Sequence, residues 1–162
     1  MKILVFSDSH GTLSFMRRCI EVTTPDTVLH LGDYYNDGQT MLEEFPQIPF
    51  HQVPGNCDLH RSWIPDPETK LFELAGVRLF MTHGHRHGVK MGLYRLLADA
   101  RASGADAVLF GHTHMAYCQQ EDGLWVVNPG AASWGGSAAL ITTQLGKIVN
   151  CVLLRPEDIK DL

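Results

Sequence analysis

The sequence predicts an α/β sandwich, in which two packed β-sheets carry helices on their outer faces. Two observations predict it. The 162-residue chain first alternates short apolar runs with helical patterns and then becomes rich in strands. A polar cluster also follows each of five predicted strands, and the sites of α/β proteins form beyond the carboxyl ends of their strands.

The first part of the chain shows three strand-and-loop units. The apolar run at 3–6 is typical of a buried strand and ends in the polar stretch SDSHG at 7–11. Thr12 can then cap a helix whose apolar positions, Leu13, Met16 and Ile20, keep helical spacing. The pattern recurs with strands predicted at 27–31 and 50–53 and a short helix at 39–45.

The later elements are predicted from apolar runs between turn residues. We expect a loop over 59–70, a hairpin of strands 71–74 and 77–81, a helix that starts near Leu93 and stops at Gly104, and strands at 107–110, 125–127, 138–142 and 148–154. No linker, repeat or low-complexity segment interrupts them. Residues 1–162 therefore read as one domain.

Composition limits the classes of function. The chain is 44% hydrophobic and 19% charged, and its net charge of -5 argues against a general nucleic-acid-binding surface. No apolar run approaches the roughly 20 residues of a membrane span. The four cysteines form no CxxC pair, so we expect reduced thiols in a soluble, cytoplasmic protein.

The polar clusters contain candidate metal ligands. The spacing of two in Asp8-x-His10 and His112-x-His114 would direct both side chains of each pair to one side of an extended backbone, where each pair could hold an ion. Carboxylate, imidazole and amide ligands suit manganese (Mn²⁺) first, with nickel, zinc, iron and cobalt as alternatives. Seven side chains are candidates: Asp8, His10, Asp33, Asn56, His83, His112 and His114.

Seven ligands are too many for one tetrahedral ion and suit two ions that share a carboxylate. With Asp8 and Asp33 the local charge would be about +2, which attracts phosphate. Two such ions also hold a bridging water, lower its pKa and stabilise the phosphorus during in-line attack. Each cluster alone is weak evidence, since Gly32-Asp33 is a common turn pair. The order of the five polar clusters along the chain, with each cluster at the end of a predicted strand, is a specific signal.

Taken together, Asp8-x-His10, Gly32-Asp33, Gly55-Asn56-x-Asp58, His83-Gly84-His85 and Gly111-His112-x-His114 resemble the calcineurin-like metallophosphoesterase superfamily. The chain looks most like its compact bacterial and archaeal phosphodiesterases. The resemblance implies a four-layer sandwich of two mixed sheets between helices. It also implies hydrolysis of phosphodiesters by a metal-bridging hydroxide.

The resemblance further assigns roles to individual residues. It implies that Asp8, His10 and His114 hold one ion, that Asp33 bridges, and that the remaining ligands, Asn56, His83 and His112, hold the other. Asn56 would also touch a phosphate oxygen, Asp58 would orient a neighbouring group, and His85 would contact substrate or support a ligand. Many members have a histidine where this chain has Cys57, although the compact phosphodiesterases commonly have cysteine there.

Two other functions stay open, along with one possible assembly. The first is a phosphatase acting on a small phosphomonoester. The second is a non-catalytic scaffold, because the small fold also resembles the retromer scaffold subunit. The expected partner is a small phosphoester substrate. Trp63 and Trp134 are candidates for an exposed apolar patch at which a homo-oligomer would form.

Overall fold

Two mixed five-stranded sheets form the centre of the protein. The computed structural model describes residues 1–58, 60, 63–133 and 135–160. The strands of the first sheet run in the order β10-β9-β1-β2-β3, with bounds Lys147–Leu154, Ala138–Gln144, Lys2–Phe6, Thr27–His30 and Phe50–Gln52. Those of the second run β4-β5-β6-β8-β7, with bounds Thr69–Leu74, Val77–Thr82, Ala107–Leu109, Leu124–Asn128 and Tyr117–Glu121.

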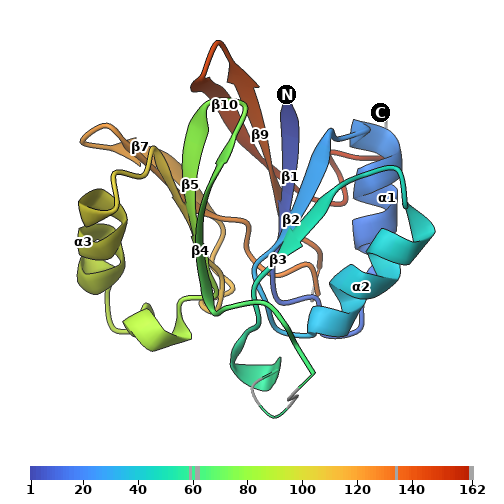
Figure 1. Ribbon diagram of the computed structural model, residues 1–162. Coiled ribbons are helices and arrows are strands. Elements are labelled where there is room, and N and C mark those ends of the chain that lie inside the picture. Colours follow the sequence, from blue (N-terminus) through green and yellow to red (C-terminus); the bar gives the residue numbers. More distant parts are fainter. Residues whose placement is uncertain (59, 61–62, 134, 161–162) are drawn as a thin grey trace.

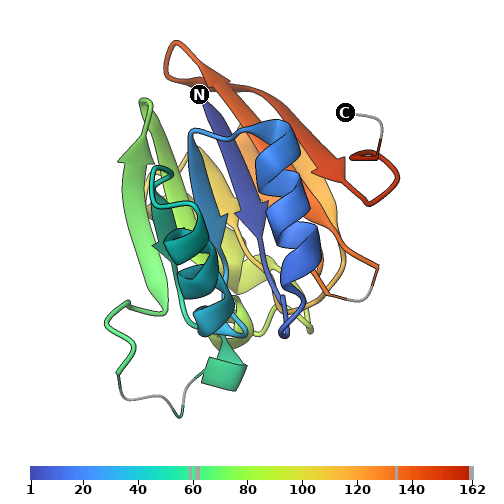
Figure 2. The ribbon, with the colours of Figure 1, turned by 90° about the vertical axis from the view of Figure 1, so that its right-hand side faces the viewer.

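Helices cover the outer face of each sheet. The helices α1 (Leu13–Thr23) and α2 (Tyr35–Glu44) lie side by side on the first sheet, and α3 (Tyr94–Ala102) lies on the second (Figures 1 and 2). Short 3-10 turns occur at Asn56–Asp58 and His85–His87. The predicted α/β sandwich with four layers is confirmed.

Strand alternation explains this layering. In β1, Ile3 and Val5 point into the apolar core between the two sheets, whereas Leu4 and Phe6 pack in the cluster that includes α1 and α2. In β6, Ala107 and Val108 divide in the same way between the central core and the cluster under α3. Successive side chains of a strand point to opposite faces, so a fully apolar run is buried on both.

Parallel pairing brings the polar clusters to one edge. The strand β1 pairs in parallel with β2, and β2 with β3, while β5 pairs in parallel with β6. Each of these strands runs into one of the clusters predicted from the sequence. The carboxyl ends of parallel strands lie at the same edge of a sheet, and the two sheets turn these edges toward each other, as the contacts below show.

The predicted helix at 39–45 is longer and starts earlier, at Tyr35. The residues Asn36, Asp37 and Gly38 have low helix propensity, but tertiary contacts override it. The backbone N–H of Tyr35 donates to Asp58 Oδ1 at 3.0 Å. A Cβ on Gly38 would lie 2.1 Å from Oε1 of Gln52 in β3, so the glycine permits close packing of α2 on the sheet.

Strand β7 was missed by the sequence prediction. Its residues, Tyr117–Glu121, are mostly polar and lack an apolar run, because β7 is an edge strand with exposed positions. Antiparallel pairing with β8 determines its conformation. At the start of α1, Thr12 takes the N-cap position as expected but donates and accepts no capping hydrogen bond through its side chain.

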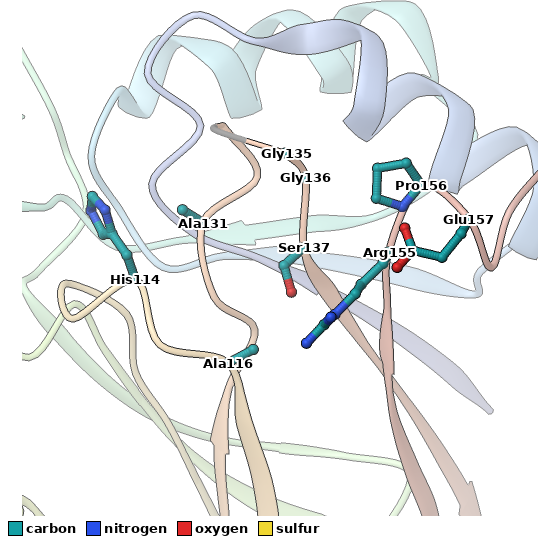
Figure 3. A pocket seen from close by; sticks show the side chains of 9 residues that line it. All are labelled: His114, Ala116, Ala131, Gly135, Gly136, Ser137, Arg155, Pro156 and Glu157. Atoms are coloured by element: carbon teal, nitrogen blue, oxygen red, sulfur yellow. The ribbon is translucent and has the colours of Figure 1, made fainter.

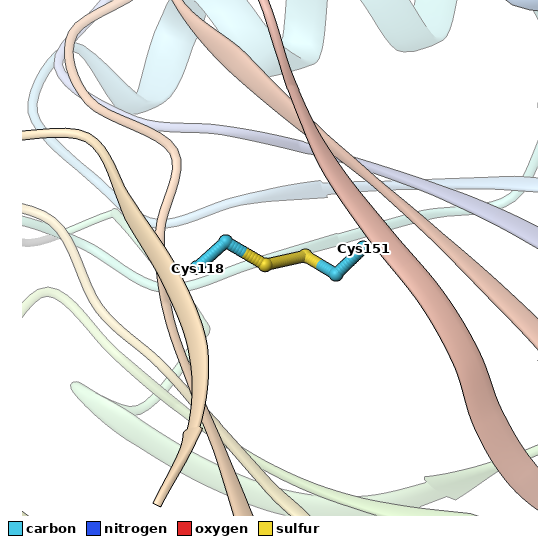
Figure 4. The surroundings of a disulfide bond; sticks show 2 residues. All are labelled: Cys118 and Cys151. Carbon is cyan, nitrogen blue, oxygen red and sulfur yellow. A yellow bond between two sulfur atoms is a disulfide. The ribbon is translucent and has the colours of Figure 1, made fainter.

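The prediction of four reduced cysteines is wrong for two of them. Cys118 in β7 and Cys151 in β10 form a disulfide, with their Cα atoms 6.5 Å apart (Figure 4). The two residues are 33 positions apart and lie in edge strands of different sheets. Sequence spacing could not reveal the pair, because sheet stacking alone brings these edges together. Cys19 is free and buried, and Cys57 is free and exposed.

Among the described residues, no helix has both the length and the apolar character needed to cross a bilayer. Of the two tryptophans proposed for an oligomer patch, Trp63 is 53% exposed. Trp134 lies outside the described residues, as do positions 59, 61 and 62 of the predicted loop. The homo-oligomer stays a prediction.

Candidate metal centre

The first group of candidate ligands surrounds one oxygen of Asp8. Nε2 of His114 lies 3.0 Å from Asp8 Oδ1, and Nε2 of His10 lies 3.9 Å from the same atom. Asp8, His10 and His114 each offer a ligand atom within 4.8 Å of the others. Loops that follow β1 and β6, one in each sheet, thus supply a common site.

The other oxygen of Asp8 is held by the protein. Asp8 Oδ2 accepts hydrogen bonds from the Ser7 hydroxyl at 2.5 Å and from the His112 backbone N–H at 3.1 Å. The Ser133 hydroxyl donates to the Asp8 carbonyl at 2.7 Å. These contacts orient the carboxylate so that Oδ1 faces the imidazoles. Ser7 and Ser133 were missed by the sequence analysis, and no pattern around them marks their role.

The second group lies around Asp33 and His83. Nε2 of His83 lies 3.5 Å from Asp33 Oδ1 and 3.9 Å from Asp8 Oδ1. Each of these three residues offers a ligand atom that lies within 4.8 Å of the other two. Asn56 Oδ1 lies 3.1 Å from the same His83 nitrogen. The His112 ring is 5.0 Å from the His83 ring, centroid to centroid. Asp33 also reaches the first group, with Oδ2 3.9 Å from His10 Nε2.

A cation fits this donor set. His83 is fully buried and its Nδ1 lies 2.8 Å from the Leu31 carbonyl, an acceptor, so Nδ1 carries a proton. Nε2 of His83 faces oxygens of Asn56, Asp33 and Asp8, none of which donates in its usual form. Among the residues that the structure describes, Nε2 of His10 is buried without a hydrogen-bond partner. A cation bound among these converging groups would offset the negative charge of the two carboxylates.

Backbone conformation at the centre is unusual. Five of the seven candidate ligands have left-handed φ angles: Asp8 (53°), His10 (45°), Asp33 (60°), His112 (67°) and His114 (59°). Non-glycine residues rarely adopt this region, and such residues cluster at functional sites. The extended backbone assumed for the two spaced pairs is therefore wrong. His112 and His114 do not face one point either, since His112 lies beside His83 and His114 beside His10.

Burial keeps the imidazole of His112 in the form that binds metals. Burial, followed by the effects of His83 and Lys90, lowers the pKa of His112 to about 4, so the ring is neutral at physiological pH. Burial by itself raises the pKa of the Asp33 carboxyl, but His83 and the Cys57 N–H outweigh it and lower that pKa below its ordinary value. Asp33 is therefore a carboxylate. Ionised carboxylates and neutral imidazoles are the ligating species.

Cys57 is not a thiolate. Its backbone N–H donates to Asp33 Oδ1 at 2.9 Å. Although the residue is exposed, desolvation at the sulfur and the contact with Asp33 raise the pKa of the thiol to about 11. A group with this pKa is a weak general acid near neutral pH.

Asp58 lies behind the centre, not in it. The side chain is 1% exposed, and its Oδ2 accepts the Gly55 N–H at 2.9 Å while Oδ1 accepts from Tyr35. Asp58 thus joins the turn at residues 55–58 to the start of α2. His30 is fully buried between the Ser9 hydroxyl at 3.0 Å and the Gly32 N–H at 3.3 Å.

His85 lies at the side of the second group. Its ring centroid is 5.5 Å from that of His83 and 6.2 Å from that of His112. Nε2 is 3.4 Å from Glu68 Oε2, but neither ring nitrogen has a hydrogen-bond partner among the described residues. Burial, then His83, lowers the pKa of His85, so the ring is neutral at physiological pH.

A cavity of about 740 Å³ opens beside the first group. Its walls are His10, Thr12, Tyr34, His114 and Ser133. Tyr34 is 40% exposed and meets the His10 ring edge-on at 5.1 Å. Two candidate ligands thus form part of the wall of a space large enough for a small molecule.

Comparison with known proteins identifies the family of the chain. A family model described as the calcineurin-like phosphoesterase superfamily domain matches residues 1–149. The chain belongs to the calcineurin-like phosphoesterase superfamily. The resemblance stated from the five motifs is thereby confirmed, and with it the prediction that the protein is a phosphoesterase.

Relatives occur in bacteria and archaea. A probable metallophosphoesterase of Mycoplasma pneumoniae is 32% identical over 133 residues, which cover 80% of this chain and 78% of that protein. A phosphodiesterase of Methanocaldococcus jannaschii is 30% identical over 151 residues, covering 80% and 83%. Members of this superfamily use divalent metals, and the two carboxylate and imidazole groups described above are the candidate ligands in this chain.

Solved structures share the fold. A predicted phosphoesterase of Streptococcus pneumoniae superposes with a TM-score of 0.72 at 23% identity, over 95% of this chain and 97% of that one. The zinc complex of Vps29 from Entamoeba histolytica superposes with a TM-score of 0.74 at 20% identity, over 96% and 99%. At these identities the likeness concerns the fold alone.

Proposed function

We propose that this superfamily member hydrolyses phosphodiester bonds at a two-metal centre. The observation that carries the proposal is the pair of carboxylates, Asp8 and Asp33, each flanked by imidazole nitrogens and linked through His10 and His83. Asp8, His10 and His114 would hold one ion, Asn56, His83 and His112 the other, and Asp33 would contact both. When bound, two divalent ions supply an activated water and stabilise negative charge on the phosphoryl oxygens.

The chain's own residues would position the substrate. Asn56 offers its amide N–H to a phosphate oxygen while its Oδ1 faces His83. His85 is a neutral imidazole whose ring nitrogens have no hydrogen-bond partner in the described part of the chain, so it can donate its N–H to the substrate and support the departing oxygen. Asp58 acts through the backbone, because it holds the turn that carries Asn56.

Manganese is the ion we propose first, with nickel, zinc, iron and cobalt as alternatives. The substrate is a small phosphoester. The cytoplasmic location, the absence of general nucleic-acid binding and the single domain over 1–162 are retained as predictions.

The deciding experiment is hydrolysis of bis-nitrophenyl phosphate by chelator-stripped protein, titrated with each metal. We expect metal to restore turnover in the wild type. Asp33→Ala and His112→Ala should each lower it by at least about 100-fold, since loss of even an outer partner of a metal site costs 10–100-fold. Equal turnover in wild type and both variants would refute the two-metal proposal.

The same assay separates the alternatives. Faster turnover of nitrophenyl phosphate than of the diester would favour the phosphomonoesterase. Binding of metal without turnover of either substrate would favour a scaffold. The likeness to Vps29 supports the scaffold through its fold alone, whereas all seven ligand positions keep metal-binding side chains.

A further inference from the structure

A second cavity adjoins the candidate metal centre and has His114 at one end (Figure 3). Its volume is about 420 Å³, and the residues that line it come from the segment before β7, the loop between β8 and β9 and the segment after β10 (Figure 3). His114 lines both this cavity and the one beside Tyr34. A ligand of the metals therefore forms the shared wall between two spaces.

The polar groups of the second cavity suit an anion. The Arg155 side chain extends into it toward Ser137, while the Glu157 carboxylate lies at the other end beside Pro156 (Figure 3). Arg17 and Arg86 pair with Glu44 and Glu68. Within the part of the chain that the structure describes, Arg155 has no carboxylate within 4.0 Å.

Ser137 adds a second polar group to this cavity. Its Oγ is buried and has no hydrogen-bond partner among the described residues. Buried polar atoms of folded proteins are nearly always paired, so an unpaired hydroxyl at a cavity wall indicates a missing partner. A hydroxyl and a guanidinium that converge can both donate to one anionic group.

The backbone of Arg155 is firmly held. Its N–H donates to Asp158 Oδ2 at 2.8 Å, and the Asp158 N–H donates to the Arg155 carbonyl at 2.9 Å. Leu154 and Ile159, on either side of this turn, are 7% and 3% exposed. The guanidinium is therefore mounted on an ordered turn at the end of β10.

We propose that this cavity is a substrate subsite, in which Arg155 and Ser137 bind a negatively charged group on one arm of the diester. The proposal rests on the proposed diesterase function and narrows its substrate class. A phosphodiester has two organic arms, and His114 lines two cavities that would take them. The Tyr34 cavity holds the uncharged or aromatic arm, and the Arg155 cavity holds the arm that carries a carboxylate or second phosphate.

The test uses two diesters with the same leaving group. Nitrophenyl 3-carboxypropyl phosphate carries a negative charge on its second arm, and nitrophenyl butyl phosphate does not. We expect manganese-loaded wild type to have about tenfold higher kcat/KM for the charged diester, as befits one charge-assisted contact that is open to solvent. Arg155→Met should abolish this preference and leave hydrolysis of the butyl diester unchanged.

Arg95→Met is the matched control, because Arg95 is an exposed arginine on α3, in the layer farthest from the first sheet. The Arg95→Met variant should keep the higher kcat/KM for the charged diester. Ser137→Ala should reduce the preference by a smaller factor. Equal kcat/KM for both diesters in wild type, or a preference that survives Arg155→Met, would overturn the subsite.

A binding measurement separates failure of the subsite from failure of the proposed function. Calorimetry would compare the Kd of 3-carboxypropylphosphonate with that of butylphosphonate. If wild type hydrolysed neither diester, the diesterase proposal would fall. The subsite would still stand on an about tenfold tighter Kd for the carboxylate, lost in Arg155→Met, and a Kd ratio near one would refute it.

Discussion

Two glycines determine how closely the chain can approach the carboxylates of the metal centre. A Cβ on Gly55 would lie 2.1 Å from Asp33 Oδ1, and a Cβ on Gly111 would lie 1.9 Å from the Ser7 hydroxyl that supports Asp8. Real Cβ atoms do not approach other atoms so closely. Any side chain at either position must displace the group that it meets.

Gly55→Ala is therefore expected to weaken metal binding by about 10–100-fold, as the loss of a supporting contact does. Calorimetric titration of chelator-stripped protein with manganese measures the change. Gly123→Ala is the control, since its Cβ would meet nothing within 4 Å and its left-handed φ of 83° affects stability alone. Unchanged affinity in Gly55→Ala would show that the turn moves without disturbing Asp33.

Cys57 is a second residue whose surroundings determine its chemistry. With a pKa of about 11, roughly one thiol in a thousand is ionised at about pH 8, and thiolate is the species that alkylating agents attack. Iodoacetamide labelling of metal-free protein should thus accelerate about tenfold per pH unit from about pH 7 to 10. Mass spectrometry locates the label. A rate that levels off near pH 8 would contradict the raised pKa, and buried Cys19 serves as the unreactive reference.

At the scale of elements, the disulfide ties together strands that pair with neighbours on only one side. β7 and β10 are the edge strands of the second and first sheets, and Cys118 and Cys151 pack against the core between the sheets. The bond therefore closes one side of the sandwich. It also anchors β10, whose end carries Arg155.

Replacing both cysteines with serine should lower the free energy of unfolding by about 3–4 kcal/mol, from the loop entropy of a 33-residue separation. Urea unfolding measures the difference. Reductant should destabilise the wild type by a similar amount and leave the double variant unaffected. If reductant has no effect on the wild type, the two thiols are unpaired in solution.

Across the whole molecule, buried acidic groups make the fold sensitive to alkali. Burial raises the pKa of Cys19 from 9.0 to about 12, and burial together with Asp66 raises that of Tyr35 above its ordinary value of 10.0. Both groups stay protonated in the folded state at pH values where the unfolded chain ionises. Their contribution to stability is complete below the unfolded pKa and is lost as pH rises toward the folded one.

The free energy of unfolding should therefore fall between about pH 9 and 12, with a slope approaching about 1.4 kcal/mol per pH unit for each fully titrating group. Chemical denaturation at a series of pH values measures the slope. Cys19→Ala should reduce the slope while lowering stability at every pH, because it leaves a cavity. Stability that does not change over this range would refute the prediction.

Much of the fold and the membership of the candidate centre could be predicted from the sequence. Apolar runs, turn residues and helical spacing are local signals. They located nine of the ten strands and the three α-helices found in the described residues. The polar strand β7 was not predicted, because its conformation depends on pairing with β8. The start of α2 was predicted too late in the chain, because contacts with Asp58 and Gln52 outweigh the weak helix propensity of residues 36–38.

The sequence by itself determined which polar side chains follow each strand, and their order identified the superfamily. Only the tertiary structure decided how those side chains face one another: His112 beside His83, His114 beside Asp8, Asp58 behind the turn. It alone paired Cys118 with Cys151 and placed Arg155 in a cavity next to His114. Strand ends are encoded by neighbouring residues in the sequence. The contacts within the metal centre, the disulfide and the cavity depend instead on how the two sheets stack. The metal centre also depends on left-handed backbone conformations, which local propensity does not favour.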